Sequence, residues 1–181
     1  MFRLTIYKKE VKITVKKAGA VMCKKNWSIM FVCHGNICRS PMAECIFKHL
    51  INQKRVEHLF TVNSSATSRE EIWGAVGNPI YPPAVRELER NKIPVVNHRA
   101  VQLAKSDYEK YDYIIAMDSN NLYNIKRIVG VDSENKVKKL MNFAGSDKDV
   151  ADPWYTDSFD IAFNDIYLGC TALLEFLLQK A

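Results

Sequence analysis

The sequence predicts a single three-layer α/β domain, in which a four-stranded parallel sheet has helices on both faces. Three observations support this prediction. Short apolar runs alternate along the chain with amphipathic stretches, as strands and helices do in a parallel sheet. The 181 residues are 48% apolar and 25% charged, which is ordinary globular composition and is enough for one buried core. No internal repeat, low-complexity segment or Gly/Ser linker divides the chain.

Four short apolar runs are predicted to be the strands of the sheet. Each is bounded by polar residues and has the length of a strand that is buried on both faces. They are SIMFVC (28–33), LFTVNSSA (59–66), YDYIIAMD (111–118) and KVKKLMNF (136–143).

The stretches between and after these runs are predicted to be helices, because their apolar residues recur at helical spacing. They are MAECIFKHLINQ (42–53), PAVRELERNKI (83–93), NNLYNIKRIV (120–129) and SFDIAFNDIYLGCTALLEFLLQK (158–180). Pro41 suits the first turn of the first helix. Gly169 is expected to be a weak point inside the last helix.

The basic charge of the chain is concentrated at its start. Residues 1–28 carry eight basic side chains and one acidic one, whereas residues 29–181 carry 18 basic and 19 acidic ones. We therefore expect residues 1–27 to be a basic, poorly ordered extension, with an extra edge strand as the alternative, and the domain to span residues 28–181. The balanced charge of the domain argues against a nucleic-acid-binding face.

Cysteine usage and hydropathy indicate the compartment. The five cysteines are Cys23, Cys33, Cys38, Cys45 and Cys170, and their odd number and irregular spacing argue against a disulfide framework. No apolar run approaches the roughly 18 residues of a membrane span, and lysines interrupt any signal-like segment at the start. We expect a cytoplasmic protein without a membrane span.

The segment VCHGNICRSP (32–41) is the strongest candidate for a functional site. It lies between the first predicted strand and the first predicted helix, where backbone N–H groups converge on one point. Gly35 allows a tight turn, and the planar fork of Arg39 suits two oxygens of a phosphate-like dianion. The same positive field favours a nucleophilic thiolate at Cys33. The predicted phosphate-binding residues are His34, Gly35, Asn36, Ile37, Cys38 and Arg39.

The segment ADPWYTD (151–157) supplies a candidate general acid. Pro153 biases Asp152 towards an extended conformation, which projects its carboxyl group from a loop. Trp154 and Tyr155 can form one wall of a slot for a flat ring. Trp73 is either the opposite wall of this slot or an ordinary packed tryptophan.

These motifs resemble those of the low-molecular-weight protein tyrosine phosphatases. The resemblance rests on VCHGNICRSPMAE (32–44), VNSSATS (62–68), HRA (98–100), YDYIIAMD (111–118) and DPWY (152–155), which follow the family's order. It implies a two-step hydrolysis of phosphotyrosine in protein substrates, without a metal or another cofactor. In that reaction Cys33 attacks phosphorus and Arg39 holds the phosphoryl oxygens. Asp152 first protonates the leaving phenol and then activates water.

The resemblance also implies supporting roles around the loop. Ser40 would stabilise the thiolate, and Asn36, Ser64 and His98 would form a buried polar network that braces the loop. From the residues alone, His98 is equally well a loop histidine that faces solvent. His34 departs from the family, which usually has a small or aliphatic residue there, and it either tunes phosphate affinity or faces solvent. The stretch SREEIWGAVGNPIYPP (68–83) is longer than in the shortest family forms.

Three other functions fit parts of the pattern. An arsenate reductase of the same fold would need further redox cysteines, yet none lies between Cys45 and Cys170. A protein-arginine phosphatase typically resembles GNTCRS in the loop, where this chain has Ile37. A non-catalytic phosphate-binding or thiol-switch module is disfavoured, because the predicted nucleophile, arginine and acid are all present.

Cys38 is a candidate redox residue. It lies five residues after Cys33 on the same tight loop, so the two thiols can approach within the distance that a disulfide needs. We predict that Cys38 resolves the sulfenic acid formed when peroxide oxidises Cys33, with a space-filling role as the alternative. The sequence does not fix the oligomeric state, and we expect a monomer.

Overall fold

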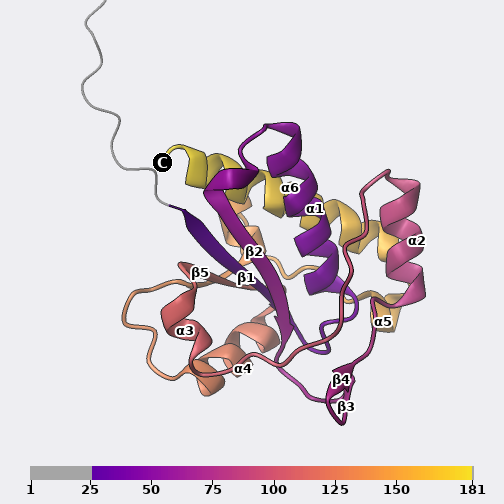
Figure 1. The fold of residues 1–181 in the computed structure, drawn as a ribbon, viewed down its shortest axis with the longest axis horizontal. Helices are drawn as coiled ribbons and strands as arrows, with labels where there is room; N and C mark the ends of the chain where they lie inside the picture. Colours follow the sequence, from indigo (N-terminus) through magenta and orange to yellow (C-terminus); the bar gives the residue numbers. More distant parts are fainter. Residues whose placement is uncertain (1–25, 181) are drawn as a thin grey trace, which may run out of the picture.

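The computed structural model describes residues 26–180, which form an α/β domain around a four-stranded parallel sheet (Figure 1). The strands lie side by side in the order β2-β1-β5-β6. Every neighbouring pair is parallel, and Ile29 of β1 lies opposite Val62 on one side and Tyr113 on the other. The strands are β1 (Trp27–Cys33), β2 (Phe60–Ala66), β5 (Tyr113–Ala116) and β6 (Val137–Lys139). The predicted fold class is therefore confirmed.

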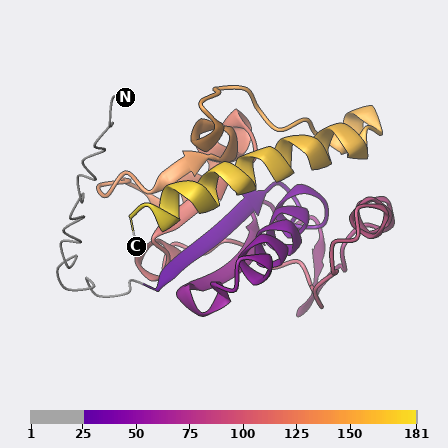
Figure 2. The same ribbon diagram turned by 90° about the horizontal axis from the view of Figure 1, so that it is seen from above.

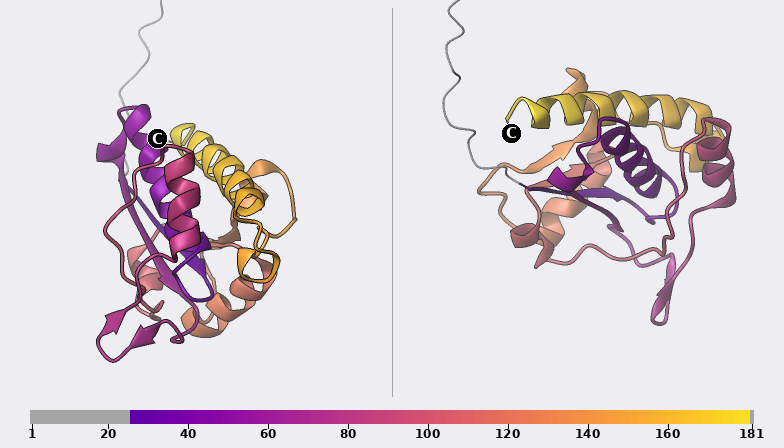
Figure 3. Two further views of the ribbon diagram at one scale, coloured as in Figure 1. Left: turned by 90° about the vertical axis from the view of Figure 1, so that its right-hand side faces the viewer. Right: turned by 45° about the horizontal axis from the view of Figure 1, so that its top comes forward.

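Helices cover both faces of the sheet. The first, second and last long helices share one core with the sheet, whereas the fourth helix packs on the opposite face. Figures 2 and 3 show α6 running the length of the domain beside α1. The helices are α1 (Arg39–Gln53), α2 (Pro82–Arg90), α3 (Asp107–Lys110), α4 (Ser119–Val129), α5 (Pro153–Thr156) and α6 (Phe159–Leu178). Short elements complete the domain: a hairpin of β3 (Ile72–Trp73) and β4 (Val76–Gly77), and the 3-10 helices η1 (Glu57–Leu59) and η2 (Leu140–Ala144).

Strand β1 lies inside the sheet, and this position explains its continuous apolar sequence. Ile29 and Phe31 enter the core beneath α1 and α6, whereas Met30 and Val32 enter the second core beneath α4. All four side chains are at most 5% exposed. Because the strand is packed on both faces, its last residue, Cys33, is held in a fixed position at the edge of the sheet.

Most element boundaries differ from the sequence prediction by a few residues, and two of these differences have a clear physical cause. β1 includes Trp27, which pairs with Phe60 and is only 6% exposed, so the strand begins one residue before the predicted residue 28. The fourth strand ends at Lys139, because Leu140 and Met141 turn into the core on η2. The predictions for residues 1–25 lie outside the described residues.

Gly169 is a site of close packing and not the weak point that was predicted. A Cβ atom at this position would lie 2.5 Å from Cγ of Leu140, so the glycine lets α6 approach η2 closely. Helix α6 also has the length and apolar composition of a membrane span, but half of that stretch is buried inside the domain. It packs as a core helix does, with Leu173 and Leu177 excluded from solvent.

Candidate active site

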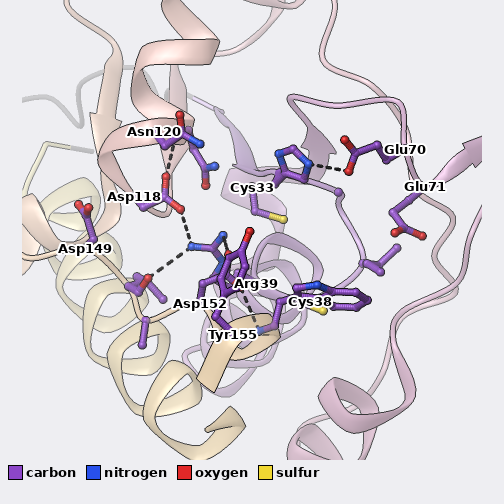
Figure 4. Close-up of a pocket in the computed structure, with 17 residues that line it drawn as sticks. Cys33, Cys38, Arg39, Glu70, Glu71, Asp118, Asn120, Asp149, Asp152 and Tyr155 are labelled. Atoms are coloured by element: carbon purple, nitrogen blue, oxygen red, sulfur yellow. Dashed lines mark hydrogen bonds and ion pairs between the residues drawn. The ribbon is translucent and has the colours of Figure 1, made fainter. Parts of the chain in front are cut away.

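The carboxyl ends of β1 and β5 open onto a pocket of about 590 Å³ (Figure 4). Parallel strands bring their carboxyl ends to one edge of the sheet, so Cys33 at the end of β1 and Asp118 after β5 both line this pocket. Figure 4 shows Cys33, Arg39 and Asp152 lying together near its centre. The three predicted catalytic side chains are thus brought into one cavity.

The loop between β1 and α1 forms much of the pocket lining. Five of the six predicted phosphate-binding residues line the pocket, namely His34, Gly35, Ile37, Cys38 and Arg39. The sixth, Asn36, is also part of the loop but does not line the pocket, and it is fully buried. It has a left-handed backbone with φ of 56°, which asparagine tolerates better than most residues do.

Hydrogen-bond donors surround the sulfur of Cys33, which is 3% exposed. The backbone N–H of Asn36 donates to Sγ at 3.3 Å, and Oγ of Ser40 lies 3.1 Å from it. Asn36 Nδ2 donates to Ser40 Oγ at 2.9 Å, so the hydroxyl proton of Ser40 remains free to turn towards sulfur or the carbonyl of Ser65. A thiolate at this position would accept both bonds, which stabilise the charged form.

The Asn36 side chain joins the loop to two distant segments. Its amide nitrogen also donates to Ser64 Oγ at 3.0 Å, and its amide oxygen accepts from the backbone N–H of Val101 at 3.0 Å. His98 Nε2 lies 2.8 Å from the Asn36 carbonyl, and the His98 side chain is only 6% exposed. The structure therefore brings together all four supporting residues, with His98 buried and not facing solvent.

Glu44 belongs to this network and was missed by the sequence analysis. Its carboxylate is buried, accepts from Ser64 Oγ at 2.6 Å and pairs with Lys48 Nζ at 2.5 Å. His98 Nδ1 lies 4.0 Å from it. The available signal was a carboxylate among the apolar residues of the buried α1 face, because buried carboxylates are nearly always partnered.

Two carboxylates hold the guanidinium of Arg39. Nη1 donates to Asp118 at 2.6 Å and Nη2 donates to Asp152 at 2.5 Å. Burial alone would lower the pKa of Arg39, but the negative charges of Cys33, Asp118 and Asp152 raise it above its ordinary value. Asp118 is the last residue of the predicted strand 111–118, but nothing local in the sequence pairs it with Arg39, which is 79 residues earlier in the chain.

The two carboxylates are anchored differently. Asp118 caps α4 by accepting from the backbone N–H of Asn121 at 2.5 Å, and its side chain is 16% exposed. Asp152 caps the four-residue helix α5 by accepting from the backbone N–H of Trp154 at 3.1 Å, and its side chain is 29% exposed. Asp152 is thus the more accessible acid and sits on the shorter element.

The predicted aromatic slot is only partly formed. Trp154 and Tyr155 line the pocket, are 59% and 85% exposed, and Trp154 packs on Tyr81 with 5.4 Å between ring centroids. Trp73 does not line the pocket; it is 74% exposed on the β3–β4 hairpin, which turns it outward. Glu70 and Glu71, from the same stretch of the chain, line the pocket in place of Trp73, as Figure 4 shows.

His34 faces this acidic side. Its Nε2 lies 2.9 Å from the carboxylate of Glu70, and its side chain is 48% exposed. The residue therefore bridges the loop to the segment after β2 at the solvent-exposed rim of the pocket.

Cys38 lines the same pocket as Cys33 and, like the other three described cysteines, is free. Burial is the main cause that raises the pKa of Cys38 to about 12, and the nearby charges of Cys33 and Asp152 raise it further. Cys38 is therefore a protonated thiol at neutral pH. Among residues 26–180, no three His, Cys, Asp or Glu side chains are grouped as metal ligands would be.

Comparisons with known proteins agree with this geometry. Residues 28–181 match the family model described as low molecular weight phosphotyrosine protein phosphatase. The low molecular weight protein-tyrosine-phosphatase YfkJ of Bacillus subtilis is 36% identical over 84% of this chain and 97% of its own. The crystal structure of YfkJ superposes with a TM-score of 0.79, over 85% of this chain and 96% of the YfkJ chain. The low molecular weight phosphotyrosine protein phosphatase of Schizosaccharomyces pombe is 41% identical over 80% of this chain and 90% of its own. A Drosophila arginine phosphatase structure is 27% identical, with a TM-score of 0.72 over 82% of this chain and 96% of that one.

Proposed function

Because the chain belongs to the low molecular weight phosphotyrosine protein phosphatase family, we propose that it hydrolyses phosphotyrosine in proteins with Cys33 as the nucleophile. One observation carries the proposal: Cys33, Arg39 and Asp152 line a single pocket, and Arg39 is bonded to Asp152. A nucleophile, a fixed cation and an acid in one cavity are what phosphoryl transfer to sulfur requires.

In the first step, the sulfur of Cys33 attacks phosphorus and the bond to the phenolic oxygen breaks. The leaving oxygen takes a proton from the carboxyl group of Asp152. The donors around sulfur, from Ser40 and the Asn36 N–H, stabilise the thiolate before attack and again when it leaves. Arg39 stabilises the charge that develops on the phosphoryl oxygens.

The Arg39–Asp152 pair must open for this step. A carboxylate that accepts a hydrogen bond from arginine is not a proton donor, and the Nη2 group that it occupies is needed by a phosphoryl oxygen. The dianion therefore replaces Asp152 on Nη2, and the released carboxylate takes up a proton from solvent, which it then gives to the leaving oxygen. Asp118 keeps its bond to Nη1 and holds the guanidinium plane in position.

In the second step, water attacks the phosphocysteine. The ionised Asp152 takes a proton from that water, the phosphorus–sulfur bond breaks, and Cys33 returns to the thiolate form while inorganic phosphate leaves. One carboxyl group thus serves as acid and then as base.

The rim of the pocket supports an aromatic phosphate as the substrate. Trp154 and Tyr155 offer exposed ring faces at the entrance, against which a phenyl ring gains contact that a serine side chain does not reach. Ile37 in the loop, where arginine phosphatases typically have threonine, favours phosphotyrosine over phosphoarginine.

Three further expectations concern the whole protein. We expect a monomer, which light scattering at micromolar concentration would test. The four described cysteines are free, as is typical of the reducing cytoplasm, where we expect the protein to act. We expect catalysis to reside in the unit that begins with β1, so a chain starting at Asn26 should keep the kcat of the full chain.

The decisive experiment compares leaving groups. Cys33→Ser should abolish turnover, because the hydroxyl is a far weaker nucleophile than a stabilised thiolate. Asp152→Asn should slow phenyl phosphate by about 10²- to 10⁴-fold but p-nitrophenyl phosphate much less, because p-nitrophenolate leaves without a proton. Asp149→Asn is the matched control, since Asp149 lines the same pocket but bonds Lys139. Equal losses on both substrates would exclude Asp152 as the acid, and equal turnover of phosphoserine or phosphoarginine peptides would contradict the substrate assignment.

A further inference from the structure

Tyr81 is the N-cap residue of α2, although its side chain is unsuited to capping. The N-cap position favours a short side chain whose oxygen accepts from the free N–H groups of the first turn, as in Asp, Asn, Ser or Thr. The hydroxyl of a tyrosine lies at the far end of its ring, and within the described part of the chain the Tyr81 side chain makes no capping bond. What the ring contributes therefore lies in what it contacts.

The ring of Tyr81 packs against two aromatic rings next to the segment of Asp152. Its centroid lies 5.4 Å from that of Trp154 on α5, at an interplanar angle of 54°, and 6.1 Å from that of Phe159, the first residue of α6. Tilted aromatic pairs at such distances are favourable beyond the apolar area that they bury. The start of α2 is thus joined to the short helix that Asp152 caps.

The backbone of Tyr81 is joined to the phosphate-binding loop. Its N–H donates to the carbonyl oxygen of Ile37 at 2.8 Å, and Ile37 lines the pocket. Tyr81 itself is not among the described residues that line the pocket. One residue outside the pocket therefore connects the loop that would bind the phosphoryl group with the segment that would deliver the proton.

Trp154 transmits this contact to Asp152. The backbone N–H of Trp154 donates to Asp152 Oδ1 at 3.1 Å, whereas Oδ2 of Asp152 accepts from Arg39. In the proposed reaction, phosphate displaces Asp152 from Arg39, so that Oδ2 is free to carry the proton while Trp154 still holds Oδ1. The position of Trp154 then sets the position of the carboxyl group, because the ion pair with Arg39 no longer does.

Resting on the proposed function, we propose that Tyr81 is a positioning residue for the general acid and that it acts through Trp154. Its ring holds Trp154, and with it the carboxyl group of Asp152, at the pocket after Asp152 has left Arg39. The protonated Oδ2 gives its proton to the phenolic oxygen as the bond between that oxygen and phosphorus breaks. Loss of the ring contact displaces the proton donor, and a displacement of about 1 Å is enough to slow a reaction substantially.

This role predicts a change in leaving-group preference. Phenolate needs the proton of Asp152 in order to leave, whereas p-nitrophenolate does not. In Tyr81→Leu, we expect the ratio of kcat/KM for phenyl phosphate to kcat/KM for p-nitrophenyl phosphate to fall about tenfold. The ratio separates positioning from a structural role, because a loss of folded protein, or of ring contacts with the substrate, lowers both kcat/KM values alike.

Tyr81→Phe and Tyr167→Leu are the matched controls. Phenylalanine keeps the ring that packs on Trp154, so Tyr81→Phe should keep the ratio of the parent protein. Tyr167 likewise packs on a phenylalanine, Phe163, with 6.0 Å between ring centroids, but it is not among the described residues that line the pocket. Tyr167→Leu removes a comparable ring contact elsewhere on α6 and should also keep the parent ratio.

A double variant tests the route through Trp154. Trp154→Leu should lower the ratio about as much as Tyr81→Leu does, because each change breaks the same ring contact. The variant with both changes should lower the ratio no further than either single change.

The possible results separate this role from the proposed function. An unchanged ratio in Tyr81→Leu would overturn the role, and so would a ratio in Tyr81→Phe as low as that in Tyr81→Leu. Additive losses, about a hundredfold in the double variant, would overturn the action through Trp154. An unchanged ratio in Asp152→Asn would instead remove the general acid from the proposed function, and the role of Tyr81 would fall with it.

Discussion

The pairing of Arg39 with Asp152 predicts that removing the Asp152 carboxylate strengthens phosphate binding. In the structure, Asp152 occupies Nη2 of Arg39 at 2.5 Å, so an incoming phosphate must displace it. Asn at position 152 can still cap α5, because asparagine and aspartate cap helices about equally well. The change Asp152→Asn therefore removes the competing charge and leaves the local fold intact.

The expected gain in phosphate affinity follows from how exposed the Arg39–Asp152 ion pair is. A hydrogen bond to a charged group contributes about 1.5 to 3 kcal/mol when buried, and exposed ion pairs contribute about 0 to 1 kcal/mol. The Asp152 side chain is 29% exposed and that of Arg39 is 3% exposed, so a value between these limits applies. We take about 1 to 1.5 kcal/mol, which corresponds to a phosphate Kd about five- to tenfold lower in the variant.

Isothermal titration of inorganic phosphate at pH 7 measures this difference directly. Asp149→Asn changes the charge of the same pocket by the same amount but removes no bond to Arg39, so it reports the effect of the field alone. We expect Asp152→Asn to bind phosphate more tightly than either the parent or Asp149→Asn. An unchanged or weaker affinity would refute the competition between Asp152 and phosphate, and equal tightening in both variants would reduce it to a general charge effect.

Three further predictions follow from single contacts. Peroxide inactivation should be reversed by dithiothreitol in the parent but not in Cys38→Ser. The attack of Cys38 on the oxidised Cys33 should accelerate about tenfold per pH unit near neutrality, since burial raises the pKa of Cys38 to about 12 and only its thiolate attacks. Full recovery of the Cys38→Ser variant would exclude this role. Although burial opposes the shift, the bond from Lys139 holds the pKa of Asp149 below its ordinary value, so the stability that this pair contributes is present above about pH 4 and is lost as the pH falls through the lower pKa of the folded state. In urea unfolding below about pH 5, the free energy of unfolding of Asp149→Asn should therefore fall less steeply with pH than that of the parent. An unchanged slope would contradict the pairing. Gly169→Ala should destabilise the domain by about 1 to 2 kcal/mol, because overpacking against Leu140 outweighs the gain of about 1 kcal/mol in helix propensity. A variant that is more stable than the parent in urea titration would show that the contact with Leu140 relaxes.

Local patterns in the sequence were sufficient for most of the fold. The strand at 28–33 could be identified because a strand packed on both faces is apolar at every position, and both cores do receive its side chains. The four long helices could be identified because their apolar residues recur at helical spacing, whereas α3 and α5, with four residues each, are too short to show such a pattern. The prediction for Gly169 was wrong for a physical reason: helix propensity measures the cost of glycine in isolation, whereas here the missing side chain admits Leu140 from another element.

The candidate site was predictable where its chemistry is local in the chain. The loop residues and Asp152 each have neighbours in sequence that indicate their role. Glu44 and Asp118 do not, because their significance comes from partners that the fold brings in from 20 and 79 residues away. Trp73 was a misleading candidate: its ring is 74% exposed on the β3–β4 hairpin and does not line the pocket, and nothing in its local sequence indicates this.

The division of labour between the two carboxylates on Arg39 follows from the elements that carry them. Asp118 caps α4, an 11-residue helix that packs against the sheet, so moving it would break a cap as well as an ion pair. Asp152 caps a helix of four residues whose only buried residue is Pro153, so its loop can move at little cost. A guanidinium with one fixed and one releasable partner would keep its orientation in the proposed exchange of Asp152 for phosphate. The longer helix therefore makes Asp118 the anchor, and the shorter one leaves Asp152 free for the proton transfers that we propose.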